Sequence, residues 1–293
     1  NLVFLDNKLG NYIGEKINEF LKEKKIQKNQ IDLIASHGHT LFHEPEINIT
    51  KQIGNGAYIC SKTNIKTVSD FRTMDVAFGG QGAPLVPIGD QLLFGNYKGC
   101  LNLGGIANIS YDLKGKRIAG DVNFANMISN YLSHKIGHSF DKDGELASRG
   151  RLDEDLILKL EKLDFYKKGF PKSLGVEDFN QWYKPLFEES KSSVNDQLFT
   201  SGTHLCRTIK NIFKFDTNET LLITGGGAHN KFWINKLKEL KIKAVIPDTK
   251  LIDFKEALIF SLLGVLKLRS EINILASVTG SSKDLSAGVI HNP

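Results

Sequence analysis

The stretch LNLGGIANISYDLKGKRIAGDVNFANM, residues 101–127, decides how the fold of this chain is interpreted. Apolar and β-branched residues flank the Gly104-Gly105 pair, which predicts a hairpin in which glycine supplies the positive φ of a tight turn. A second turn is expected to lead into a third strand that ends at Asp121. From Asn126 the apolar spacing becomes helical. The stretch therefore predicts three strands joined by two turns, followed by a helix.

Two features of this stretch would suit phosphate chemistry. A glycine hairpin exposes backbone N–H groups that can hold phosphate oxygens. Asp121, at a strand end beside the hairpin, could act as a base. Taken alone, however, the stretch is better explained by an ordinary hairpin followed by an aspartate that caps a helix. The rest of the chain has to decide between these interpretations.

Length and composition indicate a globular protein. The 293 residues suffice for two modest domains or one large domain, and 41% are hydrophobic and 24% charged. The net charge of +5 comes from scattered lysines without interleaved aromatics, so we expect solvated lysines and no nucleic-acid partner. No segment is apolar over the roughly 18 residues of a membrane helix, and no signal peptide is visible, so no membrane partner is expected.

The cysteines indicate a reducing compartment. Cys60, Cys100 and Cys206 lie far apart, are odd in number and have no metal-ligand spacing. We therefore expect small buried thiols in a cytoplasmic protein.

Polar or glycine-rich segments follow three other predicted strands. The strand at 31–36 ends in Ser36-His37-Gly38-His39-Thr40, and the strand at 66–70 ends in Asp70-Phe71-Arg72. The strand at 221–224 runs directly into Gly225-Gly226-Gly227. Ligands of α/β proteins bind past the carboxyl ends of strands, so these segments are candidate binding sites. The triple glycine is neither a Walker A loop nor a complete Gly-x-Gly-x-x-Gly fingerprint.

Helices are expected between these strands, which predicts an α/β fold with mixed sheets and two lobes around a cleft. The expected helices cover about 6–24, 55–62, 126–138, 151–164, 193–213 and 253–268, with a further helix after the glycine-rich turn at 79–84. An insertion rich in proline, glycine and aromatic residues occupies 165–187.

Eight motifs follow one another in the chain. They are Ser36-His37-Gly38-x-Thr40, Asp70-Phe71-Arg72 with Asp75, Gly79-Gly-Gln-Gly-Ala-Pro-Leu85, Asn102-x-Gly-Gly-Ile-Ala-Asn108, Asp141-x-Asp-Gly144, Pro171-Lys-Ser-x-Gly175, Gly225-Gly-Gly-Ala-His-Asn230 and Glu256-Ala257. Each motif is weak alone, whereas the ordered set is specific. Together they resemble the anhydro-N-acetylmuramic acid kinases of bacterial cell-wall recycling.

The resemblance implies the two-lobed actin-like ATPase fold that sugar kinases share with Hsp70 and actin. It implies an amino-terminal lobe of residues 1–97 with about 270–293, and a carboxyl-terminal lobe of 98–269. The family opens with a Gly-Thr-Ser-x-Asp-Gly phosphate hairpin that does not occur in this chain, so the first lobe is expected to be incomplete. Dimerisation is expected only at the level of the family.

The resemblance also implies a reaction. ATP, with Mg²⁺ bridging its phosphates, would phosphorylate O6 of 1,6-anhydro-N-acetylmuramic acid while water opens the 1,6-anhydro bridge, giving N-acetylmuramate 6-phosphate. Asp121 occupies the place of the family's catalytic base, which would take a proton from the attacking water.

Binding roles are carried over residue by residue. The sugar would be bound by His37, Arg72 and Glu256, with Arg72 suited to a carboxylate. The nucleotide and its phosphates would be bound by Gly104, Gly105, Asn126, Gly225, Gly226 and Gly227.

Each sugar-binding role has a plainer alternative. His37 could hydrogen-bond only to backbone, Arg72 could be a surface ion-pair partner, and Glu256 could favour the positive end of its helix. His39 and His43 are assigned no role.

Two departures from the family motifs keep other functions open. The family's base motif, Asp-Thr-Gly-Pro-Gly-Asn, reads Asp-Val-Asn-Phe-Ala-Asn at 121–126, and His39 replaces a glutamine. Together with the missing hairpin, these changes would fit a remnant that binds nucleotide and sugar without transferring phosphate. A kinase of the same fold that acts on another carboxylated sugar is the third hypothesis.

Overall fold

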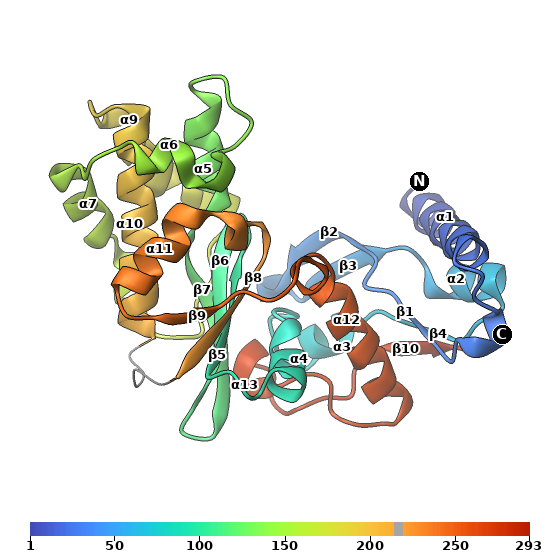
Figure 1. Ribbon diagram of the computed structural model, residues 1–293. Helices are drawn as coiled ribbons and strands as arrows, with labels where there is room; N and C mark the ends of the chain where they lie inside the picture. The colour runs from blue at the N-terminus through green and yellow to red at the C-terminus, as the bar shows by residue number, and fades with distance from the viewer. Residues whose placement is uncertain (214–218) are drawn as a thin grey trace. The chain divides into compact units, whose positions relative to one another are not determined.

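The structure is a computed structural model that describes residues 1–213 and 219–293 (Figure 1). The chain divides into two compact units. Unit 1 comprises Asn1–Leu93 and Glu256–Pro293, and unit 2 comprises Phe94–Lys255. The division differs from the predicted lobes mainly at residues 256–269, which belong to unit 1. The ring of Phe260, for example, lies 5.6 Å from that of Phe71 and 4.8 Å from that of His37.

Unit 1 contains two small sheets. In the first, β4 (Thr67–Ser69) lies between β1 (Ile34–Ala35), which is parallel to it, and β10 (Val289–His291), which is antiparallel. The strand predicted at 31–36 is therefore shorter than expected, and it is half-buried rather than buried. The second sheet is a hairpin of β2 (His39–Glu44) and β3 (Ile49–Ile53). The sequence did not predict this hairpin, because β2 is largely exposed and lacks an alternating pattern.

The longer helices of unit 1 match the predicted helices, with small shifts at their ends. They are α1 (Leu2–Glu23), α2 (Gly56–Thr63) and α4 (Val86–Leu93). The short helices α3 (Thr73–Ala77) and α13 (Ala276–Thr279) and the 3₁₀ turns η1 (Lys28–Gln30) and η2 (Pro45–Ile47) were not predicted. The long helix α12 (Thr249–Leu268) begins in unit 2 and continues into unit 1.

Unit 2 is built on a five-stranded mixed sheet of order β7-β6-β5-β8-β9. Its strands are β5 (Gly99–Leu103), β6 (Ile106–Leu113), β7 (Lys116–Phe124), β8 (Thr220–Thr224) and β9 (Lys243–Val245). The first three form antiparallel hairpins, and β5, β8 and β9 are parallel. The α/β class with mixed sheets is thus confirmed.

Two details of the 101–127 stretch differ from prediction. Neither Gly104 nor Gly105 has a positive φ; it is the β6–β7 turn that has φ of 50° at Lys114 and 78° at Gly115. Two consecutive positive φ values are typical of the tight turn that matches strand twist. In addition, β7 does not end at Asp121 but continues to Phe124, because Val122 and Phe124 pack in the core at 0% exposure.

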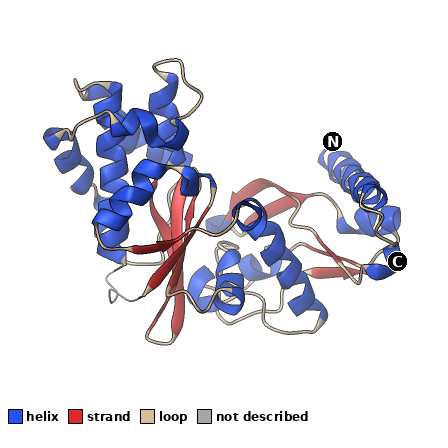
Figure 2. Cartoon of the chain, viewed as in Figure 1, coloured by secondary structure: helices blue, strands red, loops and turns tan. Residues whose placement is uncertain are grey.

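Helices pack along the sheet of unit 2 and beyond the carboxyl ends of β5 and β8 (Figure 1). They are α5 (Asn126–His134), α6 (Glu145–Ser148), α7 (Glu154–Glu161), α8 (Val176–Asp178), α9 (Lys184–Glu189), α10 (Val194–Ile212) and α11 (Lys231–Glu239). Short turns complete them: η3 (Lys142–Gly144), η4 (Asp164–Lys167), the π-helical η5 (Phe179–Tyr183) and η6 (Gly226–His229). The aromatic insertion at 165–187 is therefore largely helical (Figure 2).

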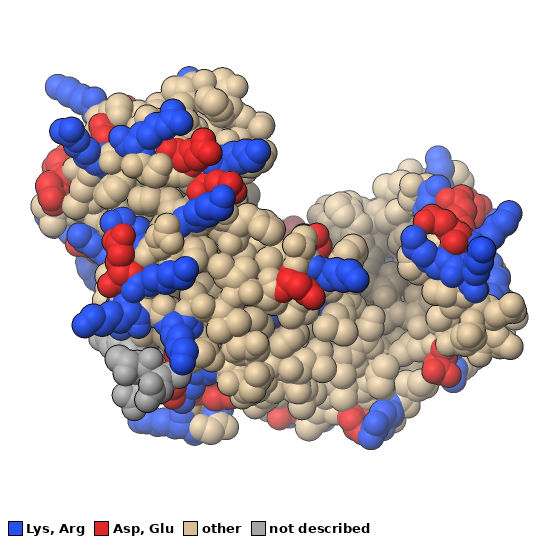
Figure 3. Space-filling view, in the orientation of Figure 1, with Lys and Arg blue, Asp and Glu red and all other residues tan. Residues whose placement is uncertain are grey.

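The charged side chains are scattered over the surface, as the sequence predicted for the lysines. Lysine and arginine side chains are interleaved with acidic ones on the face shown in Figure 3. All three cysteines are buried, and none of them forms a disulfide. Within the described ranges, no helix has the length and apolar character needed to cross a membrane.

Candidate functional sites in the two units

The predicted nucleotide-binding residues of unit 2 come together at one edge of its sheet. Strands β5, β7 and β8 run in the same direction, since β6 is antiparallel to both β5 and β7. Their carboxyl ends therefore share an edge. The Gly104-Gly105 turn follows β5, Asn126 lies just after β7, and Gly225–Gly227 follows β8.

Asn126 and its neighbours hold the glycine turn through its carbonyl groups. The Asn126 side-chain amide donates to the carbonyl oxygens of Leu103 (3.0 Å) and Gly104 (2.9 Å). The backbone N–H groups of Ala125 and Met127 both donate to the carbonyl oxygen of Gly105. A Cβ atom on Gly105 would meet nothing within 4 Å. The turn is thus held rigidly on one side and is open on the other.

The triple glycine turn packs closely against the end of β5. Gly225 has a φ of +80°, and a Cβ on Gly227 would lie 2.6 Å from the Cβ of Leu103. A Cβ on Gly226 would instead have only the Asn126 amide nitrogen nearby, at 3.9 Å. Gly225 and Gly227 therefore serve the turn and its packing, whereas Gly226 leaves space beside Asn126.

Asp121 is held by the backbone of the insertion. Its carboxylate accepts a hydrogen bond from the Leu174 N–H (2.8 Å), and its own N–H donates to the carbonyl of Lys172 (2.8 Å). Burial raises the pKa of Asp121 to about 6, against the opposing effect of the Leu174 hydrogen bond. The alternative that Asp121 caps the following helix is wrong, because Ala125 occupies that position.

Lys172 anchors the segment that binds Asp121, a role that the sequence did not predict. Its Nζ lies 4.3 Å from the ring centre of Phe165 and 5.5 Å from that of Phe170, and it donates to the Phe165 carbonyl. Burial, and then the charge of Lys168, lower the pKa of Lys172. The aromatic residues of the insertion, which gave no chemical signal in the sequence, thus fix a lysine by cation–π contacts.

In unit 1 the structure pairs two predicted sugar-binding residues. Arg72 donates from Nε to Nε2 of His37 at 2.9 Å, and the other ring nitrogen of His37 lies 3.0 Å from the Gly38 carbonyl. Since arginine can only donate, His37 is neutral with its proton on Nδ1. Burial, and then the charge of Arg72, lower the pKa of His37 accordingly. The alternative in which Arg72 is a surface ion-pair partner is not what the structure shows.

A buried aspartate organises the loop around Arg72. Arg72 also donates from Nη1 to the Gly82 carbonyl. The N–H of Gly82 donates to Asp75 (2.7 Å), which is fully buried and also accepts from the Thr279 hydroxyl (2.7 Å). Asp75 thereby holds the carbonyl that orients the guanidinium. The sequence showed Asp75 only as part of a motif, and its role depends on Thr279, more than 200 residues away.

Glu256 is exposed on α12, and its charge opposes the lowering of the Arg72 pKa by burial. The alternative that Glu256 sits at the start of a helix is wrong, because α12 begins at Thr249. His39, in β2, is exposed, and His43 lies 3.1 Å from the Thr50 hydroxyl. Neither histidine gains a role from these positions.

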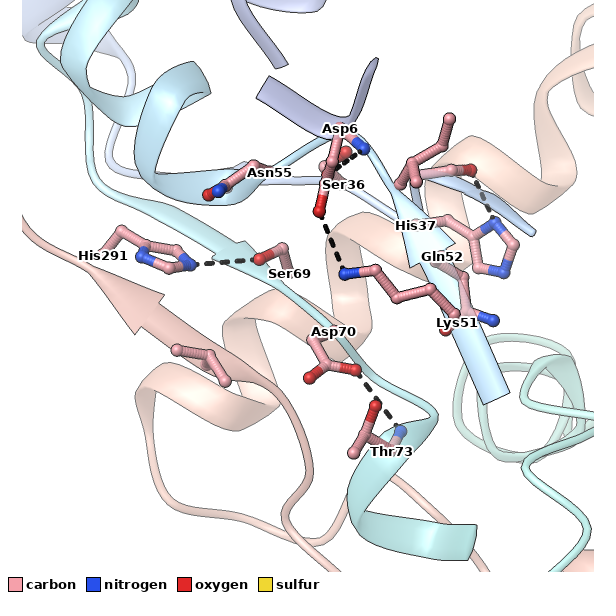
Figure 4. Close-up of a pocket in the computed structure, with 15 residues that line it drawn as sticks. Asp6, Ser36, His37, Lys51, Gln52, Asn55, Ser69, Asp70, Thr73 and His291 are labelled. Atoms are coloured by element: carbon pink, nitrogen blue, oxygen red, sulfur yellow. Dashed lines mark hydrogen bonds and ion pairs between the residues drawn. The ribbon is translucent and has the colours of Figure 1, made fainter. Parts of the chain in front are cut away.

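A polar pocket of about 210 Å³ lies beside His37 in unit 1 (Figure 4). Asp6 and Lys51 form an ion pair across 3.0 Å in its wall, and Asp70 lines it with a φ of +58°. A positive φ is uncommon outside glycine and often marks functional sites. The lining offers both donors and acceptors, which suits a hydroxylated ligand.

With this geometry described, comparison with known proteins is informative. The family model described as anhydro-N-acetylmuramic acid kinase matches residues 1–293. The chain belongs to this family. Two relatives called anhydro-N-acetylmuramic acid kinase are those of Aliivibrio fischeri, 34% identical, and Vibrio parahaemolyticus, 36% identical. In both cases the match covers 98% of this chain and 82% of the relative.

Among solved structures, the chain is similar to an activator of 2-hydroxyisocaproyl-CoA dehydratase from Clostridium difficile with bound ADPNP. The TM-score is 0.39 at 13% identity, over 69% of this chain and 68% of the other. Component A of (R)-2-hydroxyglutaryl-CoA dehydratase from Acidaminococcus fermentans gives a TM-score of 0.38 at 12% identity, over 68% of this chain and 77% of the other.

Proposed function

We propose that the protein is an ATP-dependent kinase that converts 1,6-anhydro-N-acetylmuramic acid into N-acetylmuramate 6-phosphate in cytoplasmic peptidoglycan recycling. Membership of the kinase family supports the substrate class. The observation that carries the chemistry is Asp121, a partly buried carboxylate with a raised pKa, anchored through backbone on a rigid strand.

Asp121 would act as the general base. One proton of the attacking water would pass to its carboxylate, while the water oxygen bonds to the anomeric carbon. The bond between that carbon and O6 would break, and O6 would take the γ-phosphoryl group of ATP, with ADP leaving. A base is most effective when its pKa lies near the working pH, and a pKa of about 6 meets that need better than that of an ordinary aspartate.

The nucleotide would be bound at the sheet edge of unit 2. The open side of the turn at Gly105 and the space beside Gly226 would admit phosphates close to backbone, with Asn126 keeping the turn in place. In the described ranges, no group of three or more His, Cys, Asp or Glu side chains could hold a metal ion. Mg²⁺ would therefore be held mainly by the ATP phosphates and water, and it would neutralise charge during transfer.

The sugar would be handled by the residues of unit 1. Since His37 occupies Nε of Arg72 and the Gly82 carbonyl accepts one hydrogen of Nη1, the substrate carboxylate would be bound through the remaining Nη hydrogens. Glu256 and the polar pocket beside His37 would contribute hydroxyl contacts. A carboxylate-binding arginine favours a carboxylated sugar, which supports N-acetylmuramic acid chemistry.

Transfer in ¹⁸O-labelled water tests this proposal. The protein, Mg-ATP and 1,6-anhydro-N-acetylmuramic acid should give N-acetylmuramate 6-phosphate carrying ¹⁸O at the anomeric position, detected by mass spectrometry. Unlabelled product would contradict the coupled hydrolysis. Absence of product, with ATP and sugar still binding in calorimetry, would favour the remnant that binds both without transfer.

A second sugar tests the carboxylate-binding role of Arg72. 1,6-Anhydro-N-acetylglucosamine lacks the lactyl carboxylate and should be a much poorer substrate because it offers no carboxylate to Arg72. Equal turnover of both sugars would contradict the carboxylate role of Arg72. Homodimer formation stays a prediction from the family, to be checked by sedimentation equilibrium.

A further inference from the structure

Asn123 lies two residues after Asp121 and is fully buried. The two residues are separated by an irregularity in the ladder between β6 and β7. Asn108 pairs with Asp121 and Ala107 pairs with Asn123, so that Val122 has no partner. An unpaired residue of this kind is a β-bulge, which bends a strand and redirects its side chains. The bulge at Val122 therefore lies between Asp121 and Asn123.

The side chain of Asn123 uses its full hydrogen-bonding capacity. Its oxygen accepts from the hydroxyls of Tyr166 (2.7 Å) and Tyr183 (3.2 Å). Its nitrogen donates to Thr208 (3.4 Å) and lies 3.1 Å from Nδ1 of His204. Burial, and then Arg207, lower the pKa of His204 to about 3, so its ring is neutral and Nδ1 can accept.

A buried polar network in which every group is satisfied specifies one arrangement of the elements it joins. This network joins β7 to α10, through His204 and Thr208, and to the insertion, through Tyr166 and Tyr183. In the sequence, Tyr166 and Tyr183 lie on either side of the segment whose Lys172 and Leu174 backbone groups bind Asp121. The insertion is thus attached to β7 on both sides of the bulge, at Asp121 and at Asn123.

We propose that Asn123 is a positioning residue for Asp121. By tying the bulge to Tyr166 and Tyr183, it holds the Leu174 N–H against the carboxylate and keeps that segment over it. The proposal rests on the proposed role of Asp121 as the base.

A matched pair of variants tests the proposal. Asn123→Ala removes the network, and Asn273→Ala removes another fully buried asparagine with three hydrogen bonds, to Leu263 and Ala287 of unit 1. Both variants should lower thermal stability. Only Asn123→Ala should lower kcat, by roughly 10- to 100-fold as expected for a misplaced catalytic group, with the KM for ATP changed less than about twofold.

The readout that separates positioning from stability is the pKa of Asp121, measured by carboxyl ¹³C NMR. Asn123→Ala should move this pKa down from about 6 toward the ordinary aspartate value, because water reaches the carboxylate. Asn273→Ala should leave it unchanged. An unchanged pKa and a kcat within about twofold of the parent in Asn123→Ala would overturn the proposal.

Two further variants keep the test decisive. If Asn123→Ala does not fold, Tyr166→Phe with Tyr183→Phe removes both donors to the Asn123 oxygen and keeps the ring packing; the same downward shift is expected, and no shift overturns the proposal. Asp121→Asn identifies failure of the underlying function instead. If that variant keeps full activity, Asp121 is not the base, whereas the NMR titration still reports whether Asn123 positions it.

Discussion

Asp121 in unit 2 and the His37–Arg72 pair in unit 1 differ in what holds their side chains and in what shifts their pKa values. Asp121 is bound through backbone groups, and burial is the main cause of its raised pKa. His37 and Arg72 are bound to each other, and burial together with the neighbouring positive charge lowers the pKa of His37. The first arrangement should respond to changes in backbone position and solvent access, and the second to changes in charge and side-chain geometry. The predictions below test this contrast, from the largest expected effect to the smallest.

Asp121→Asn should lower kcat by about 10²- to 10⁴-fold, because an amide cannot take a proton. ATP affinity should stay within about twofold, as measured by calorimetry. Asp143→Asn is the control, since Asp143 is a surface ion-pair partner of Lys231 and should keep full activity. Retention of more than a tenth of the parent kcat in Asp121→Asn would mean that another group is the base.

Arg72→Lys should raise the KM for the anhydro sugar by roughly 10- to 100-fold, because lysine retains the charge but loses the planar fork and the hydrogen bond to His37. The effect on kcat should be smaller than on KM. Arg269→Lys, on an exposed arginine paired with Glu271, is the matched control and should leave both constants unchanged. A normal KM in Arg72→Lys would show that a positive charge alone suffices for sugar binding. It would contradict the expectation that the His37–Arg72 pair responds to side-chain geometry.

The two sites should show opposite pH dependences of stability. The folded-state pKa of Asp121 is raised, so its stabilising contribution is full below the unfolded pKa of about 4 and is lost as pH rises through about 6. The free energy of unfolding of Asp121→Asn should therefore exceed that of the parent by about 2 kcal/mol at pH 8, because the variant buries no charge. The difference should shrink by pH 4. Urea unfolding at several pH values measures this, and a constant difference would contradict the raised pKa.

The pKa of His37 is lowered in the folded state, so its contribution is present above the unfolded pKa of about 6.5 and is lost as pH falls through the folded value. Protonation would place a proton on Nε2, where Arg72 donates. His37→Gln should accordingly make unit 1 less sensitive to acid than the parent, in the same urea series. Equal acid sensitivity would show that the His37–Arg72 hydrogen bond is not maintained in solution.

The smallest effect on stability is expected from Gly105→Ala, which meets open space and has no positive φ to preserve. It should leave unfolding nearly unchanged but weaken ATP binding by about 1 kcal/mol, roughly fivefold, by filling the open side of the turn. Gly225→Ala is its counterpart, with a φ of +80° and a Cβ 2.6 Å from the Asn102 side-chain oxygen. It should cost about 1–3 kcal/mol of stability. If both variants changed stability equally, Gly105 would have a packing role rather than a binding one.

Much of the secondary structure of both units could be predicted from local patterns. Helical spacing located α1, α5 and α10 to within a few residues, and apolar runs located β5, β6 and β8. The β2–β3 hairpin and the short helices α3 and α6 gave no comparable signal, because their residues are mostly exposed or their lengths too short for a period to emerge. The end of β7 was missed because Phe124 packs against Phe179 of the insertion, which is distant in sequence.

The order of residues alone was enough to indicate the family and the α/β class, because motifs and apolar periods are local properties of the chain; the catalytic and binding roles of the motif residues stay predictions. Only the tertiary structure showed that His37 accepts from Arg72, that Asp75 orients Arg72 through Gly82, and that Asp121 binds Leu174 of the insertion while Asn123 binds its Tyr166 and Tyr183. These hydrogen bonds join residues 7 to 60 positions apart. They depend on burial and on distances between elements, which a linear pattern does not contain.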